Sequence, residues 1–104
     1  MTLQHDIWME WLLKRRFSGD AARMKVTMEH LFKVRDTVLS HVNLKEGETL
    51  LDVGCGDGLI AFGALEKVSS GRVIFSDISQ DLLTHVQNLA ENMRLTGRCQ
   101  FVQV

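Results

Sequence analysis

The sequence has no strong excess of charge: 12 basic side chains accompany 13 acidic ones in 104 residues, for a formal net charge of −1. A nucleic acid or an anionic membrane surface is therefore not indicated as the main partner. No stretch is apolar for long enough to span a bilayer. The charged start of the chain also lacks the hydrophobic segment of a signal peptide, which predicts a cytoplasmic protein.

Cysteine is scarce, with only Cys55 and Cys99 in the chain. Their separation matches no zinc pattern, so no metal site is expected, and both are interpreted as reduced structural thiols. Low-complexity runs are absent and 45% of the residues are apolar, which is typical of a folded segment rather than a disordered one. The length allows one domain with a modest core.

Helical periodicity occupies the first part of the chain. The range Asp6–Arg16 predicts a short amphipathic helix, and a break at residues 18–20 precedes a longer one. One face of the longer helix is expected to carry the apolar residues Met24, Met28, Leu31, Val38 and Val42, with Phe32 and Leu39 beside them. We expect residues 1–48 to form a helical cap in which this stripe is core packing, with Arg16 and Arg23 as solvated surface charges.

Strands and helices alternate through the remaining residues. The expected strands are Thr49–Val53, apolar on both faces, Arg72–Ser76 and Cys99–Val104. A helix over Leu59–Val68 joins the first two strands. A second helix is capped by Ser79, buries Leu82, Val86, Leu89 and Met93, and ends at Gly97. This order predicts right-handed β-α-β units and a parallel sheet, which is an α/β fold.

A glycine-rich loop follows the first strand, in the stretch Leu-Leu-Asp-Val-Gly-Cys-Gly-Asp-Gly that ends at Gly58. Its three glycines, Gly54, Gly56 and Gly58, allow a ligand to lie directly on the main chain. Asp52 and Asp57 would disfavour a pyrophosphate but tolerate a cationic ligand. Leu59 also stands where the dinucleotide fingerprint requires glycine or alanine.

Asp77 ends the second strand, about twenty residues beyond the loop, where a carboxylate can accept both hydroxyls of a ribose. We expect its side chain to point into a solvated crevice. The ligand should then carry a ribose and a positive charge but no phosphate. S-adenosylmethionine has these properties.

With its two motifs, the glycine loop and Val-Ile-Phe-Ser-Asp-Ile-Ser, the chain resembles the Rossmann-like S-adenosylmethionine-dependent methyltransferases over roughly residues 45–104. The resemblance implies a three-layer fold with strand order 3-2-1, of which residues 49–104 form the first half. It also implies that Asp52 faces the methionine end of the cofactor, the glycines form the floor, Asp77 holds the ribose and Ile78 packs on the adenine. Cys55 lies within this floor, where close packing is expected rather than nucleophilic chemistry, because no histidine is adjacent to activate it. The candidate cofactor-binding residues are Asp52, Gly54, Cys55, Gly56, Gly58, Asp77 and Ile78.

The implied activity is transfer of a methyl group to a small-molecule acceptor, by a catalytic residue that the sequence does not identify. The alternatives are a non-catalytic scaffold or S-adenosylmethionine-binding fragment and a nicotinamide-dependent oxidoreductase. The family's sheet is larger than the one predicted here. We therefore expect these 104 residues alone to be inactive and to self-associate through an exposed first strand at Leu50, Leu51 and Val53.

Overall fold

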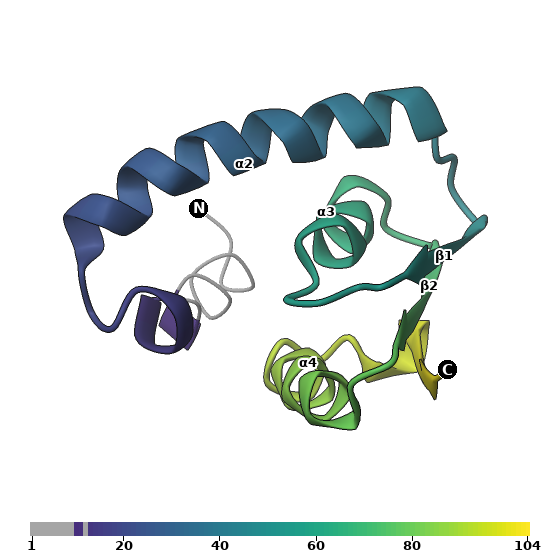
Figure 1. The fold of residues 1–104 in the computed structure, drawn as a ribbon. Helices are drawn as coiled ribbons and strands as arrows, with labels where there is room; N and C mark the ends of the chain where they lie inside the picture. Colours follow the sequence, from purple (N-terminus) through teal and green to yellow (C-terminus); the bar gives the residue numbers. More distant parts are fainter. Residues whose placement is uncertain (1–9, 12) are drawn as a thin grey trace.

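The computed structural model describes residues 10, 11 and 13–104 (Figure 1). Residues 10, 11 and 13–16 are helical, whereas residues 6–9 and 12 of the predicted helix Asp6–Arg16 lie outside the described part of the chain. Ser18 and Gly19 then take left-handed backbone conformations, with φ of 48° and 84°. Asp20 begins the next helix as its N-cap, because its carboxylate accepts a hydrogen bond of 3.0 Å from the backbone N–H of Arg23.

Helix α2, Ala21–Val42, is the longest element and crosses over the rest of the chain (Figure 1). Met24, Met28 and Leu39 are buried, which confirms that the methionine stripe is core packing. The predicted face was wrong in its second half, since Val38 and Val42 are 39% and 44% exposed. Leu39, which was expected beside this face, is the buried residue of the second half, because its side of α2 packs on α3.

A parallel sheet contains strands β1 (Thr49–Val53), β2 (Arg72–Asp77) and β3 (Cys99–Gln103) in the order β1-β2-β3. Read from the other edge, this is the predicted order 3-2-1. The α/β class and the Rossmann-like arrangement are confirmed. Strand β2 is one residue longer than predicted and includes Asp77, while β3 ends one residue earlier.

Helices α3 (Leu59–Lys67) and α4 (Gln80–Asn92) lie on the same side of the sheet (Figure 1). Right-handed crossovers require this when successive strands are added in one direction. Phe62 of α3 packs on Phe75 of β2, and Phe75 stacks on Phe101 of β3, with ring centroids 5.1 and 5.0 Å apart. Aromatic rings thus join one helix to two strands at the centre of the core.

Helix α4 differs from its prediction at one buried position and in its end. Val86, Leu89 and Met93 are buried as predicted, whereas Leu83 is buried in place of the half-buried Leu82. The helix ends at Asn92, and Arg94 takes the left-handed conformation with φ of 60°. Gly97 was predicted to stop the helix but lies within the following 3₁₀ turn, η1 (Thr96–Arg98).

The connection from α3 to β2 is held by two charged side chains. Arg98 donates three hydrogen bonds to backbone carbonyls around the end of α3, at distances of 2.6 to 3.3 Å. Glu46, just before β1, accepts hydrogen bonds from the backbone N–H and the hydroxyl of both Ser69 and Ser70. These bonds close the amino-terminal end of the sheet.

The sheet face opposite α3 and α4 is uncovered in the described residues. Leu51 and Val53 of β1 are 57% and 72% exposed, and Val102 of β3 is 45% exposed. The expected exposure of the first strand is therefore observed at Leu51 and Val53, whereas Leu50 is half-buried on the helix side. The described residues thus supply the sheet and one of the two helical layers that flank it in a Rossmann-like fold.

Candidate functional site

The glycine loop leaves β1 at its carboxyl end and is fixed to the neighbouring strand. The backbone N–H groups of Gly54 and Cys55 both donate to the carbonyl of Ser76, at 2.8 and 2.9 Å. Gly54 and Gly56 have positive φ, 73° and 53°, and a Cβ atom on either would meet nothing within 4 Å. Both glycines therefore combine a left-handed backbone with open space above it, as a ligand resting on the main chain requires.

Gly58 has a different role. It is the N-cap of α3 with φ of 83°, and a Cβ atom there would lie 2.6 Å from the ring of Phe62. Gly58 is thus required by core packing, whereas Gly54 and Gly56 are open to a ligand.

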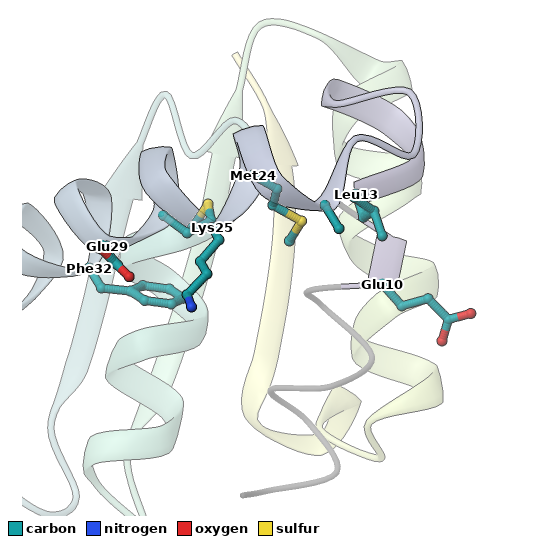
Figure 2. A pocket seen from close by; sticks show the side chains of 8 residues that line it. Glu10, Leu13, Met24, Lys25, Glu29 and Phe32 are labelled. Atoms are coloured by element: carbon teal, nitrogen blue, oxygen red, sulfur yellow. The ribbon is translucent and has the colours of Figure 1, made fainter.

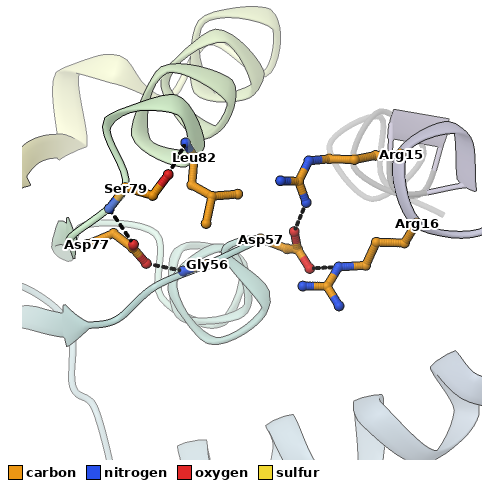
Figure 3. A network of polar contacts seen from close by, with 7 residues as sticks. All are labelled: Arg15, Arg16, Gly56, Asp57, Asp77, Ser79 and Leu82. Carbon is orange, nitrogen blue, oxygen red and sulfur yellow. Dashed lines mark hydrogen bonds and ion pairs between the residues drawn. The ribbon is translucent and has the colours of Figure 1, made fainter.

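Asp77 connects the loop to the start of α4. Its two carboxylate oxygens accept hydrogen bonds from the backbone N–H groups of Gly56, at 3.0 Å, and Ser79, at 2.9 Å (Figure 3). These two bonds, with that from Ser79 the stronger influence, lower the pKa of Asp77. The expectation of a solvated side chain was wrong: Asp77 is only 7% exposed, because it holds the loop in place.

Asp52 lies near the carboxyl end of β1, just before the loop, and bonds to Ala61 in the first turn of α3. Burial raises the pKa of Asp52, assisted by the negative charge of Asp77 and opposed by a hydrogen bond from the backbone N–H of Ala61. Its Oδ2 atom is buried and has no hydrogen-bond partner among the described residues. Such an atom costs about 1–3 kcal/mol. A buried acceptor without a donor beside an open loop is therefore a candidate contact for a bound cation or donor group.

Cys55 and Ile78 have opposite environments. Cys55 is buried, and this burial together with the carboxylates of Asp52 and Asp77 raises its pKa to about 11. The thiol is therefore protonated at neutral pH and unsuited to nucleophilic chemistry. Burial also raises the pKa of Cys99 to about 11. Ile78 is 78% exposed and presents an apolar side chain beside Asp77.

The N-terminal helical residues contact the same loop through ion pairs that the sequence analysis missed. Arg15 donates to Oδ1 of Asp57 at 2.9 Å, and Arg16 pairs with Oδ2 of the same carboxylate (Figure 3). Arg16 is 54% exposed, as expected of a surface charge, but its ion pair with Asp57 was not predicted. On the other side, the Trp11 ring lies 6.1 Å from the ring of His85 in α4, between centroids. The described helical residues 10, 11 and 13–16 thus reach from α4 to the glycine loop.

An apolar cavity of about 410 Å³ lies between Leu13 and the first half of α2 (Figure 2). Met24, Met28 and Phe32 form much of its wall, with Glu10 and Lys25 among its charged lining residues. The described residues contain no group of three or more side chains that could hold a metal ion and no helix able to cross a membrane.

Comparison with known sequences identifies the glycine-loop unit. Residues 50–104, just over half of the chain, match a family described as "Methyltransferase domain". The chain is 43% identical over 51 residues to the ribosomal protein L11 methyltransferase of Thermotoga maritima, covering 49% of this chain and 18% of that protein. It is 31% identical over 80 residues to a probable protein arginine N-methyltransferase 3 of Oryza sativa, covering 77% of this chain and 12% of that one. The chain therefore spans less than a fifth of the length of these relatives.

Solved structures show the same fold. The crystal structure of the MccD protein superimposes with a TM-score of 0.60 at 17% identity, over 67% of this chain and 30% of that one. The structure of YjhP from E. coli superimposes with a TM-score of 0.56 at 20% identity, over 67% of this chain and 28% of that one. The loop, the strand order and the sequence match agree, and the chain belongs to the methyltransferase domain family, whose methyl donor is S-adenosylmethionine.

Proposed function

We propose that the chain is the cofactor-binding part of an S-adenosylmethionine-dependent methyltransferase. The observation that carries the proposal is the space above Gly54 and Gly56, where a Cβ atom on either glycine would meet no other atom within 4 Å. The loop follows Asp52, whose Oδ2 atom has no partner among the described residues, and its Gly56 bonds to the carboxylate of Asp77. Residues 1–48 then act as a helical cap, and residues 49–104 as the first half of the methyltransferase domain.

The residues present fit this cofactor. The ammonium group of its methionine end can donate to Oδ2 of Asp52, which has no partner among the described residues. The Asp77 carboxylate accepts backbone hydrogen bonds from Ser79, Gly56 and, as the weakest influence, Ile78. A carboxylate offers about four acceptor positions, so one remains for a ribose hydroxyl. Ile78, exposed beside Asp77, offers an apolar surface for the adenine ring, and Cys55 contributes packing beneath the loop.

A nicotinamide dinucleotide fits less well. Its pyrophosphate would have to lie beside Asp52, Asp57 and Asp77, of which only Asp57 is ion-paired to arginines in the described residues. Like charges at short range in a partly buried site are strongly unfavourable. A sulfonium cofactor without phosphate avoids this repulsion.

S-adenosylmethionine supplies an activated methyl group on a positively charged sulfur, and the protein contributes by aligning the acceptor and excluding water. We propose a small-molecule acceptor. The names of the relatives indicate protein substrates, but the matched segments cover only 18% and 12% of those proteins. A shared cofactor unit leaves the choice of acceptor to other parts of each protein.

The proposal is tested by calorimetric titration of the chain with S-adenosylhomocysteine and, separately, with NAD. We expect S-adenosylhomocysteine to bind and NAD not to bind. Gly56→Val should abolish binding by filling the open space, whereas Gly97→Val, at a glycine with similar space but without positive φ, should not change it. Circular dichroism checks that both variants fold. Binding of NAD without S-adenosylhomocysteine would refute the proposal.

A further inference from the structure

A cavity of about 470 Å³ lies on the side of the glycine loop that faces the N-terminal helices. Its lining comes from three separate segments: the end of the helical residues 13–16 with the turn that follows, the first half of α2, and the loop with the start of α3. The cavity is lined by Arg16, Phe17, Arg23, Thr27, Leu31, Asp57 and Leu59. This volume is within the range of small-molecule sites.

The charges around this cavity do not cancel. Asp57 is the only carboxylate among the described lining residues, and it already pairs with Arg15 and Arg16. Arg23 lies with its guanidinium carbon 6.0 Å from the centre of the Phe17 ring. Within the described part of the chain, no carboxylate is within ion-pair distance of its guanidinium. One cation at the cavity is therefore available to a ligand.

The remaining lining is mostly apolar. Phe17 is 8% exposed, and Leu31 and Leu59 are half-buried side chains that pack against the core. Thr27 adds one hydroxyl. Apolar walls with one free guanidinium are suited to a compact apolar molecule that carries a single negative charge, because Asp57 in the same wall disfavours a more highly charged ligand.

We infer that this cavity binds the methyl acceptor, and that the acceptor is a small apolar acid whose carboxylate pairs with Arg23. The inference rests on the proposed function, since it assigns a substrate class to the same site. Its geometric support is that Asp57 and Leu59 line the cavity while flanking Gly58 of the loop. Gly56, next to Asp57, faces Asp77 on the other side of that loop (Figure 3). A ligand in the cavity and a cofactor on Gly56 therefore share one short loop.

Benzoate is a suitable probe, and benzamide is its neutral counterpart of nearly equal size. In calorimetric titrations of the whole chain, we expect benzoate to bind at least tenfold more tightly than benzamide. Arg23→Gln should remove this preference. Lys33→Gln, the same change of charge on the exposed surface of α2 outside the cavity, should leave it unchanged. Leu31→Trp should weaken both probes by occupying the cavity while retaining every charge.

Titration with S-adenosylhomocysteine on the same samples separates the two proposals. The inference is overturned, and the proposed function stands, if S-adenosylhomocysteine binds to the chain but benzoate does not. The same conclusion follows if S-adenosylhomocysteine binds and benzoate binds to Arg23→Gln or Leu31→Trp as well as to the unchanged chain. If benzoate and S-adenosylhomocysteine exclude one another, the cavity belongs to the cofactor and the inference is overturned. If benzoate binds as predicted but S-adenosylhomocysteine does not, the cavity is an acid-binding site. The proposed methyltransferase function and the assignment of the cavity to a methyl acceptor are then both overturned. Simultaneous binding with the predicted variant effects supports both.

Discussion

Asp52→Asn should change stability and ligand affinity in opposite directions. The carboxylate of Asp52 has one oxygen buried without a partner among the described residues, and burial raises its pKa. An asparagine keeps an oxygen for the backbone N–H of Ala61 and replaces the unpaired charged atom with a neutral amide. The free chain should therefore be more stable with asparagine at this position.

The size of both effects follows from the contacts. An unsatisfied buried group costs about 1–3 kcal/mol, and because the amide nitrogen is also unpaired we expect a gain of about 1 kcal/mol in the free energy of unfolding at pH 7. A hydrogen bond between charged groups contributes about 1.5–3 kcal/mol, so losing the contact to an ammonium group should weaken S-adenosylhomocysteine binding by about tenfold to a hundredfold.

The stability difference should depend on pH. Because the pKa of Asp52 is raised in the folded state, the folded chain holds this proton more tightly than the unfolded chain. The protonated Asp52 contributes to the free energy of unfolding below the pKa of the unfolded chain, about 4. This contribution is lost as the pH rises through the higher pKa of the folded chain. The advantage of Asp52→Asn should thus be largest at neutral pH and disappear near pH 4.

Urea denaturation between pH 4 and 7.5 and calorimetric titration with S-adenosylhomocysteine measure the two quantities. Glu91→Gln, an exposed side chain on α4, provides a control with the same loss of charge. A less stable Asp52→Asn chain with unchanged affinity would show that the carboxylate is a structural contact, and the reasoning from its unpaired oxygen would be refuted.

Three further predictions concern the loop and the sheet. Asp77→Ala removes the acceptors for the N–H groups of Gly56 in the loop and Ser79 at the start of α4, and should cost about 2–3 kcal/mol of unfolding free energy at pH 7. Because the pKa of Asp77 is lowered, this loss should shrink as the pH falls below about 4, and a loss independent of pH in urea titrations would contradict the prediction. Gly58→Ala should cost about 2–3 kcal/mol and Gly56→Ala about 1 kcal/mol, since both have positive φ but only the former meets a ring; equal thermal stabilities would count against the division of roles. We propose that the chain self-associates through the uncovered face of β1, so light scattering should show a mass that rises with concentration and a monomer for Leu51→Lys with Val53→Lys; a variant that still associates would exclude this face.

Local sequence patterns were sufficient to predict the elements of the sheet and its crossover helices. Strand and helix periods and the cap at Ser79 depend on neighbours along the chain, and Ser79 does accept from the backbone N–H of Leu82. The face of α2 was harder to predict. Val38 and Leu39 are both apolar, and only the position of α3 determines which of them is buried.

The candidate site was predictable in its residue types but not in its contacts. The position of Asp77 at the end of β2 follows from the order of elements along the chain. Its hydrogen bond to Gly56 depends on the left-handed backbone of Gly56, which lies in the loop after β1. Similarly, the pairing of Arg15 with Asp57 joins residues far apart in the sequence. The only sequence signal was a basic run without acidic residues beside it, which is equally typical of a solvated surface.

The hydrogen bonds of Arg98 and Glu46 at the amino-terminal end of the sheet have a consequence for motion. Both side chains find their partners within the chain: Arg98 donates to backbone carbonyls, and Glu46 accepts from Ser69 and Ser70. At the opposite end, Asp52 retains an unpaired atom and Gly54 and Gly56 have open space above them. The amino-terminal end of the sheet is therefore held by internal hydrogen bonds, whereas the carboxyl end has groups left for a ligand, so a ligand can order the carboxyl end without deforming the other. Amide hydrogen exchange along each strand should accordingly slow toward the amino-terminal end, and protection by a ligand should concentrate at the carboxyl end.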